Sequence, residues 1–408
     1  MSDIACNASA KHRRHRRGRA SHGSLTRLSA LIAALLLIGA ACGGDSTESG
    51  PGTTTTSTNT LAPTTTEDAP TTTKALSADS STTTASPTTT TTSAQTDPTD
   101  VEIATINVLH GFPPPVSGCV EHTDNCLAPI RVDILWKYLD QQAGCPEIIA
   151  LQEISPRWFE IIPEKLPALC GGEHVLLTEN VGQIDQEMIL TTLPVIDHAR
   201  VELAGRPIWS AHWAQLDAGN SLIVDVFATH YASSAFNPPC DDSHPATSCP
   251  SYCPADGDLG SCHPFQTLDF LTNRAAENSL RVIVGDLNKQ ISDPRIQTLL
   301  DGGFIDTHLA ANNAECPPTG GANCTAGIGG PGDLHGLDIA EQTLRSRIDF
   351  ILAAPPPGCE LLVDVGDADE DSTHTGLWAD KPLDEPVEGL YWASDHTGVQ
   401  ADIGLDCR

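Results

Sequence analysis

The chain has 408 residues and carries 22 Lys and Arg against 53 Asp and Glu, a formal net charge of -31. Seven of the basic residues and one acid precede Cys42, so the remainder holds 15 basic and 52 acidic side chains, about -37. This balance argues against a broad basic surface for nucleic acid, although a nuclease that holds cations in its active site remains compatible with it.

Residues 1–41 have the features of an export signal. Residues 11–19 are strongly basic, and the apolar run that ends at Cys42 is too short to span a bilayer comfortably. The sequence GAAC resembles a bacterial lipobox, in which the cysteine is diacylated, although Gly39 stands where that pattern usually has leucine. We expect Cys42 to be lipidated and to hold the exported protein at the outer face of the cell membrane. With a plain signal peptide, the protein would instead be secreted.

Residues 43–100 consist mainly of Thr, Ser, Pro and Ala and contain scarcely any larger aliphatic residue. So few aliphatic side chains cannot bury enough surface to offset the entropy lost on ordering, so we expect a disordered tether. As a flexible coil it would reach roughly 40 Å. One globular domain then remains, over residues 101–408.

Beyond residue 100, short apolar runs rich in β-branched residues alternate with helical patterns. The predicted strands are 101–107, 147–153, 187–192, 221–230, 280–288, 347–353 and 396–403, and the predicted helices are 129–142, 264–278 and 292–301. The motif DAGN at 217–220 predicts a hairpin turn. Because the strands are almost continuously apolar, burial of both faces is expected, which favours two packed sheets with helices outside.

Fourteen cysteines are too many for an ordinary cytosolic enzyme, and the twelve beyond Cys42 are an even number, which predicts disulfides and an oxidising compartment. Spacing favours local pairs such as Cys119 with Cys126 and Cys316 with Cys324. A zinc site is the alternative for the cluster 240–262, although its spacing matches no common zinc module.

Polar side chains stand at the ends of several predicted strands. They are Asn107, Glu153, His230, Asp286 with Asn288, and Asp395 with His396. A carboxylate at the end of a buried strand is costly to desolvate unless a cation, a donor or solvent meets it. Several acids in such positions predict a shared, cation-filled cleft at one edge of the sheets.

Six sequence blocks follow one another in the order and approximate spacing of a known superfamily. They read TINVLHG, IIALQE, ATH, VGDLN, RIDFIL and SDHTGV, and they extend from the first predicted strand to the last. The chain therefore resembles the endonuclease/exonuclease/phosphatase superfamily, typified by deoxyribonuclease I. The resemblance implies an α/β (α+β) fold, a four-layer sandwich of two packed mixed β-sheets flanked by helices. It also implies divalent-metal-dependent hydrolysis of phosphoesters.

Such hydrolysis needs charge neutralisation at phosphorus, a deprotonated water and a proton for the leaving oxygen. We expect Glu153 to be the metal ligand with Asn107 beside it, since hard oxygen donors suit Mg²⁺ or Mn²⁺. Asp395 would complete this metal site. Asn107 capping a turn after its strand is the alternative.

The resemblance implies the remaining roles. Asp286 would activate the attacking water, and Asn288 would hold a phosphate oxygen or a metal-bound water. His396 would bind the phosphate, oriented by Asp349. His230 would be the general acid.

A glutamate orients this general acid in deoxyribonuclease-like members, and Glu187 is the candidate here. Two alternatives stay open, because His230 could be a buried histidine without a role and Asp349 could pair with Arg347. The acid run 367–371 could bind structural Ca²⁺, although a solvated loop explains it as well. The glycine-rich string 327–332 is a loop, because no strand precedes it.

The resemblance leaves the substrate open. The long insertion 232–279, with four cysteines, has few aromatic residues for a membrane surface, which favours a nuclease acting on DNA or RNA. A phospholipid head group, cleaved as by a sphingomyelinase or phospholipase C, and an inositol phosphate are the alternative substrates. A non-catalytic cell-surface binding protein is the alternative of another class, although the core motifs are intact.

Overall fold

The computed structural model describes residues 100–110, 126–179, 185–205, 209–233, 237–241, 243, 247–254, 257–329, 334–363 and 375–408. The expected signal, Cys42, all but the last residue of the expected tether, Cys119 and the acid run 367–371 lie outside these residues. Within them, no helix is long and apolar enough to cross a membrane.

The first sheet has seven strands and contains the first and last strands of the domain. Its strands are β1 (Val101–Asn107), β2 (Ile148–Gln152), β3 (Val175–Leu177), β4 (Met188–Thr191), β11 (Cys359–Val363), β12 (Gly376–Trp378) and β13 (Gly398–Cys407). Their order is β11-β13-β1-β2-β4-β3, with β12 also paired to β13. The sheet is mixed, because β1 is parallel to β2 and antiparallel to β13.

The second sheet has six strands in the order β5-β6-β7-β8-β10-β9. They are β5 (Val195–Glu202), β6 (Ser210–Asp217), β7 (Ile223–Thr229), β8 (Leu280–Asp286), β9 (Ile305–Asp306) and β10 (Asp349–Ala354). This sheet is also mixed, since β7 and β8 are parallel and the other pairs antiparallel. The predicted hairpin turn lies between β6 and β7.

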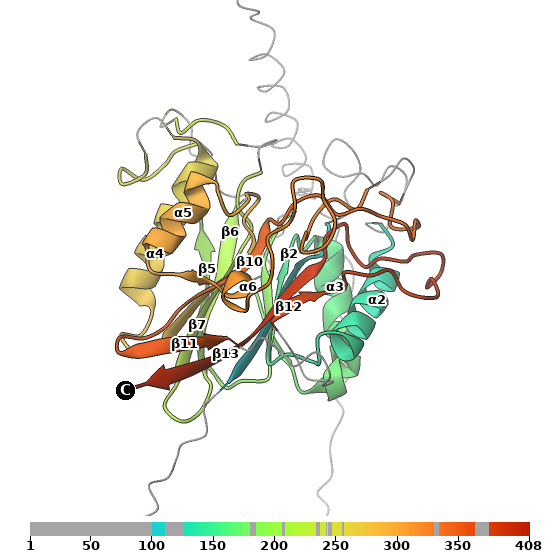
Figure 1. Ribbon diagram of the computed structural model, residues 1–408, viewed down its shortest axis with the longest axis horizontal. Coiled ribbons are helices and arrows are strands. Elements are labelled where there is room, and N and C mark those ends of the chain that lie inside the picture. The colour runs from blue at the N-terminus through green and yellow to red at the C-terminus, as the bar shows by residue number, and fades with distance from the viewer. Residues whose placement is uncertain are drawn as a thin grey trace, which may run out of the picture. The chain divides into compact units, whose positions relative to one another are not determined.

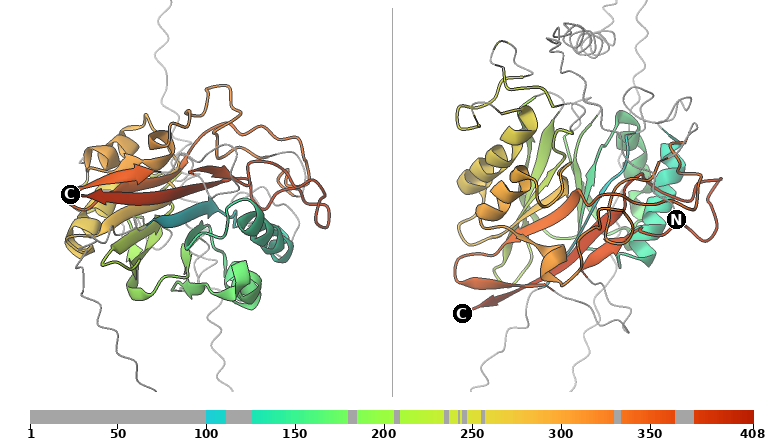
Figure 2. Two further views of the ribbon diagram at one scale, coloured as in Figure 1. Left: turned by 60° about the horizontal axis from the view of Figure 1, so that its bottom comes forward. Right: turned by 45° about the horizontal axis from the view of Figure 1, so that its top comes forward.

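The two sheets face each other across a shared apolar layer, which includes Ile103, Ile148, Val226 and Val284. Helices α2 (Ala128–Gln141) and α3 (Pro156–Lys165) cover the outer face of the first sheet, while α4 (Leu259–Arg274) and α5 (Pro294–Asp301) cover that of the second. Two 3-10 turns (Leu166–Ala168 and Cys170–Gly172) and the short α6 (Thr307–Ala310) complete the described elements. The views in Figures 1 and 2 show this helix–sheet–sheet–helix order, and the four-layer fold is confirmed.

Helix α4 begins earlier than the sequence pattern predicts. Its first residue is Leu259 rather than residue 264, because Asp258 caps the helix and its carboxylate accepts the backbone N–H of Ser261 at 2.8 Å. Pro264 therefore lies inside the helix rather than at its start. The helix ends at Arg274, where Ala275 turns to an extended backbone.

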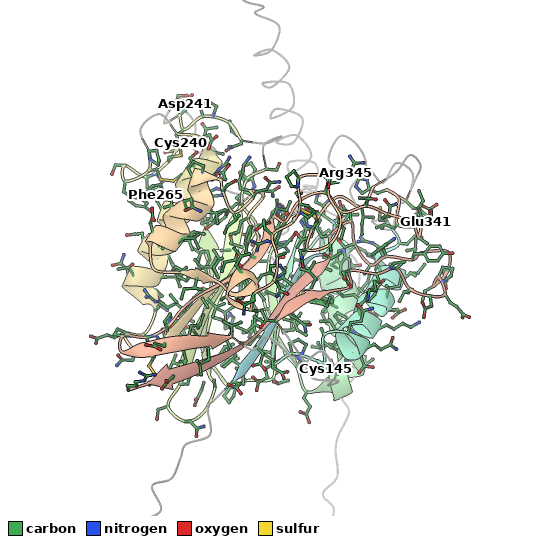
Figure 3. All side chains as sticks on the ribbon, in the orientation of Figure 1. Cys145, Cys240, Asp241, Phe265, Glu341 and Arg345 are labelled. Atoms are coloured by element: carbon green, nitrogen blue, oxygen red, sulfur yellow. A yellow bond between two sulfur atoms is a disulfide. The ribbon has the colours of Figure 1, made fainter. Side chains whose placement is uncertain are left out.

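Five disulfides join described cysteines. They are Cys145–Cys170, Cys240–Cys249, Cys253–Cys262, Cys316–Cys324 and Cys359–Cys407. The predicted Cys316–Cys324 pair is confirmed, and the zinc alternative for the cluster 240–262 is wrong because its four cysteines are bonded to one another. Cys126 is also disulfide-bonded. The labelled Cys240 lies beyond one end of α4, in the disulfide-containing insertion (Figure 3).

Candidate active site

The sheet topology brings the predicted polar residues to one edge. Asn107 ends β1 and Glu153 directly follows the parallel strand β2, while His230 directly follows β7 and Asp286 ends the parallel strand β8. Asp349 opens β10, which is antiparallel to β8, so it lies directly opposite Asp286.

Asn107 links the two sheets. Its Nδ2 donates to Glu153 Oε1 at 2.9 Å and to Asp286 Oδ2 at 3.1 Å. Its Oδ1 accepts the backbone N–H of Leu109 at 2.9 Å. Asn107 therefore also caps the turn after its strand, as the alternative proposed. Glu153 and Asn288 both have a left-handed backbone, with φ of 60° and 55°. Such strain in non-glycine residues is typical of functional sites.

His230 is held by an acid that the sequence reasoning missed. Its Nδ1 donates to Asp185, 3.0 Å from Oδ2 and 3.1 Å from Oδ1. The expectation that Glu187 holds this ring is wrong, because Glu187 accepts a hydrogen bond from Ser210 Oγ at 2.7 Å instead. Both acids lie just before β4, where a strand pattern does not yet define which side chain faces the edge. The only sign of Asp185 in the sequence was that an acid lies two residues before the candidate Glu187.

The other ring nitrogen of His230 faces the centre of the site. Its Nε2 lies 3.5 Å from Asp286 Oδ2 and 2.8 Å from Asn288 Nδ2, which also donates to Tyr231 O at 2.9 Å. In this arrangement Nε2 accepts and Nδ1 carries the proton. A doubly protonated ring would require the Asn288 amide to turn its oxygen toward Nε2.

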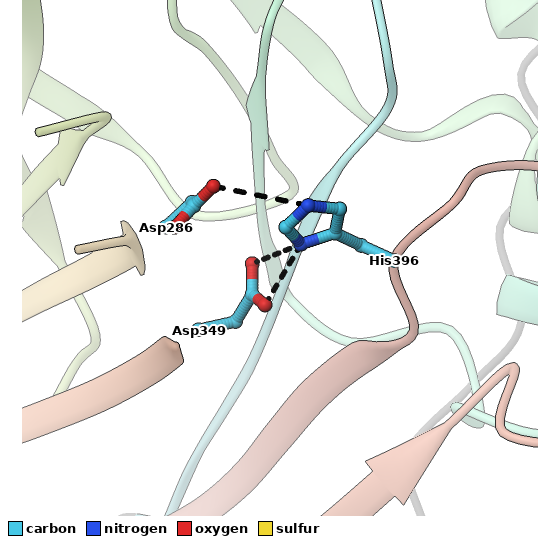
Figure 4. Close-up of side chains that lie close together, drawn as sticks. All are labelled: Asp286, Asp349 and His396. Carbon is cyan, nitrogen blue, oxygen red and sulfur yellow. Dashed lines mark hydrogen bonds and ion pairs between the residues drawn. The ribbon is translucent and has the colours of Figure 1, made fainter. Parts of the chain in front are cut away.

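His396 forms a second histidine–aspartate pair. Its Nδ1 lies 2.9 Å from Asp349 Oδ2 and its Nε2 lies 3.9 Å from Asp286 Oδ2 (Figure 4). Asp349 is fully buried. The alternative pairing of Asp349 with Arg347 is wrong, because the Arg347 guanidinium binds Asp306 and Glu315.

Burial and charge set the protonation of these groups. Burial alone would lower the pKa of His230 and His396, but the adjacent aspartates and Asp286 outweigh it and raise both pKa values well above the ordinary one. Burial and then the charge of Asp349 raise the pKa of Asp286 to about 6. The site thus combines a basic carboxylate with two histidines that favour the charged form.

Glu153 and Asp395 are half-buried carboxylates at the same edge. Burial raises the pKa of Glu153, but the nearby His110 and His230 lower it further than burial raises it. Asp395 has a pKa of about 2, since the hydrogen bond from His335 and the charges of His396 and His335 outweigh burial.

Two further histidines therefore belong to this edge. His335 Nε2 lies 3.2 Å from Asp395 Oδ2, and the backbone N–H of His110 donates to Glu153 Oε2 at 2.9 Å. Sequence reasoning assigned neither of them. His110 belongs to the block TINVLHG, whereas His335 lies in a loop without any strand pattern.

The donor chemistry fits a divalent cation. Among the described residues, Asp286, Asp349 and His396 have ligand atoms within 4.8 Å of one another. Because His396 Nδ1 already contacts both oxygens of Asp349, this group acts first as a histidine–aspartate pair that faces Asp286. Glu153 and Asp395 offer further half-buried carboxylate oxygens, the donors that hard cations prefer.

A buried arginine joins the loops around these carboxylates. The Arg131 guanidinium of α2 donates to the carbonyls of Leu109 and Cys126 at 2.8 Å and of Ala393 at 3.1 Å. It lies over the Trp158 ring, 5.0 Å from its centroid. Burial is the main reason its pKa falls to about 10, and Asp395 and Glu153 oppose that fall.

Comparison with known proteins gives the fold and little more. No family model matches the chain, and the curated proteins contain no match. An endonuclease/exonuclease/phosphatase family protein from Bacteroides thetaiotaomicron matches with a TM-score of 0.50 at 14% identity, over 76% of this chain and 100% of that one.

Two further crystal structures match more distantly. The endonuclease/exonuclease/phosphatase from Bacteroides vulgatus has a TM-score of 0.48 at 17% identity, over 75% of this chain and 99% of its own. D. rerio TDP2 complexed with single strand DNA product has a TM-score of 0.47 at 14% identity, over 74% and 98%. The observed sheets and the match at a TM-score of 0.50 show that the chain shares the two-sheet sandwich fold of that Bacteroides thetaiotaomicron protein.

Proposed function

We propose that this protein is a divalent-metal-dependent phosphoesterase of the endonuclease/exonuclease/phosphatase superfamily. One observation carries the proposal. Two histidines, each oriented by its own aspartate, direct Nε2 at the same oxygen of Asp286, at 3.5 Å from His230 and 3.9 Å from His396. A carboxylate between two such histidines can accept one proton while a second group donates another.

Each side chain has a part in this reaction. Asp286 accepts the proton of the attacking water, and its raised pKa of about 6 makes it a stronger base than an exposed aspartate. His396 donates Nε2–H to a phosphoryl oxygen, with Asp349 fixing the tautomer. His230 protonates the leaving oxygen, with Asp185 holding its ring. Glu153 and Asp395 would hold a divalent cation, which would supply charge neutralisation at phosphorus.

A phosphodiester of nucleic acid is the proposed substrate. Within the described part of the insertion 232–279, Tyr252 is the one large apolar side chain that is strongly exposed, at 49%. A lipid hydrolase needs a broader apolar surface to enter a membrane. The strongly acidic chain weakens long-range attraction to DNA or RNA, so binding depends on the site and its cation.

We further propose that the protein is exported, with a lipid on Cys42. The five disulfides among the described cysteines support an oxidising compartment outside the cytosol. Loss of palmitate labelling in Cys42→Ser tests the anchor. Unlabelled protein in the medium would contradict it.

A substrate panel tests the proposed activity. The protein is incubated with plasmid DNA, RNA, sphingomyelin and inositol polyphosphate, with Mg²⁺, Mn²⁺ or EDTA. Cleavage of nucleic acid that requires metal, and whose rate falls in His230→Gln, supports the proposal of a nuclease. Metal-dependent turnover of lipid or inositol phosphate instead would replace the substrate, and no turnover of any of them would contradict the proposal. His198→Gln, which changes an exposed histidine of β5, is the matched control.

A further inference from the structure

The pair of His396 and Asp349 is assembled from two backbones that belong to different sheets. Asp349 opens β10 of the second sheet, whereas His396 lies in the loop just before β13 of the first (Figure 4). The side chains meet with His396 Nδ1 2.9 Å from Asp349 Oδ2. A side-chain contact of this kind does not fix the separation of two backbones, so other contacts must do so.

A segment around Thr325 lies between these two backbones and bonds to both. The Thr325 hydroxyl oxygen accepts the backbone N–H of Ile348 at 3.1 Å and that of Asp349 at 3.2 Å. The Thr325 carbonyl accepts the backbone N–H of Thr397, the residue after His396, at 2.7 Å. Thr325 is fully buried, so a lost hydrogen bond here cannot be replaced by solvent.

The residue after Thr325 repeats this link. Ala326 forms antiparallel β-bridges with Ser346 on one side and with His396 on the other. Its backbone N–H donates to Ser346 O at 2.9 Å. Residues 325 and 326 therefore lie like a short strand between the two backbones, and a shift of either residue changes the separation of Asp349 from His396.

A disulfide closes the loop that carries this segment. It joins Cys324, which is fully buried, to Cys316. At the other end of the loop, Glu315 accepts hydrogen bonds from Arg347 Nε, which lies 3.1 Å from each carboxylate oxygen. Both ends of the disulfide-closed loop therefore contact the chain at Asp349 or within two residues before it.

We propose that Thr325 is the positioning residue of the His396–Asp349 pair and that the Cys316–Cys324 disulfide braces it. Thr325 acts through the backbones of both partners and not on the substrate. The inference rests on the proposed function only for the part that His396 plays in the reaction.

Two substitutions test the hydroxyl group. Thr325→Val keeps the shape of the side chain but leaves the backbone N–H groups of Ile348 and Asp349 without this acceptor, whereas Thr325→Ser keeps the hydroxyl. Thr307→Val is the matched control, because Thr307 is also fully buried and its hydroxyl also bonds β10, at 2.9 Å from Ile351 O. Circular dichroism confirms that each variant is folded.

Proton NMR reads the pair without an activity assay. An imidazole N–H that donates to a buried carboxylate resonates far downfield, and His396 and His230 each direct Nδ1 at an aspartate. His396→Gln and His230→Gln assign the two resonances. We expect Thr325→Val to shift or broaden the His396 resonance and to leave the His230 resonance unchanged. Thr325→Ser and Thr307→Val should change neither resonance.

Paired cysteine substitutions test the brace. Cys316→Ser with Cys324→Ser removes a disulfide between residues 8 apart, and Cys240→Ser with Cys249→Ser removes a control disulfide between residues 9 apart. The similar spacing gives the two losses a similar loop entropy. We expect the first pair of substitutions to change the His396 resonance and the control pair to leave it unchanged. The opposite result would remove the brace.

Kinetics supply a second readout of the hydroxyl. In the proposed reaction His396 donates to a phosphoryl oxygen, whose charge grows in the transition state. Thr325→Val should therefore lower kcat by about 10–100-fold and change KM less, while Thr325→Ser retains hydrolysis. A His396 resonance that Thr325→Val leaves unchanged, or an equal change in the His230 resonance, would overturn the inference.

The two proposals fail separately. A His396 resonance that depends on the Thr325 hydroxyl, in a protein that hydrolyses no phosphoester, would keep the positioning role and remove the proposed function. Metal-dependent hydrolysis that Thr325→Val leaves unchanged would keep the function and remove the positioning role.

Discussion

His263 gives a prediction of how acid weakens the fold next to the site. The ring is fully buried on α4, with Nε2 2.9 Å from Ala204 O and Nδ1 accepting the backbone N–H of Ala232 at 3.3 Å. One nitrogen must donate and the other accept, so the ring is neutral. Burial is the largest cause that lowers its pKa from 6.5 to about 4.

The difference between folded and unfolded pKa sets the magnitude and the sign. A histidine with a pKa of about 6.5 when unfolded and about 4 when folded binds its proton mainly in the unfolded state between these values. Its contribution to the stability of the folded state is therefore fully present above pH 6.5 and is lost as the pH falls to 4. A shift of about 2.5 units corresponds to roughly 3 kcal/mol.

Denaturant unfolding at about pH 7.5 and about pH 4 measures this loss in the protein and in His263→Gln. Glutamine offers one donor and one acceptor but does not titrate. We expect the free energy of unfolding to fall, between the two pH values, by about 3 kcal/mol less in the variant than in the unaltered protein. His212, whose pKa is also lowered to about 4 by burial, contributes equally to both proteins and cancels in the difference. Equal losses in the two proteins would refute the assignment.

Two other predictions concern the histidine–aspartate pair at His230 and the disulfides. Asp185→Asn should lower kcat/KM by about 10²–10⁴-fold because His230 loses its orienting carboxylate, whereas Glu187→Gln should cost less than about 10-fold. Steady-state kinetics compare the two variants, and the reverse order would restore Glu187 as the orienting acid. Replacing both cysteines of Cys359–Cys407, 48 residues apart, with serine should destabilise by about 4 kcal/mol, against about 2.5 kcal/mol for Cys316–Cys324, 8 residues apart. Unfolding measurements that reverse this order would contradict the loop-entropy argument.

The sequence predicted most of the strands that are buried on both faces, but it missed β6, which is also largely buried, and the exposed edge strand β5. β1, β2 and β8 are almost entirely buried, so their apolar runs were unmistakable. β5 is an edge strand whose residues are exposed or half-buried, so its sequence VIDHARVE lacked an apolar pattern. α3 was missed because Pro163 lies inside it, where proline normally ends a helix.

The sequence could predict those residues of the candidate site that stand at the ends of strands. Asn107, Asp286 and Asp349 meet because strand direction and register fix their positions. Asp185 and His335 enter from segments without regular structure, where spacing along the chain says nothing about distance in space. Only the fold could reveal these partners.

Asp286 lies between two oriented histidines, and we propose that it is the base of a metal-dependent phosphoesterase. The most direct measurement is hydrolysis of a chromogenic phosphodiester by the protein and by Asp286→Asn, with divalent metal or EDTA. The exposed Asp217→Asn, at the hairpin turn after β6, is the matched control. We expect hydrolysis that needs metal, survives in the control and falls by about 10²–10⁴-fold or more in Asp286→Asn. Hydrolysis that persists in EDTA, or that Asp286→Asn leaves unchanged, would contradict it.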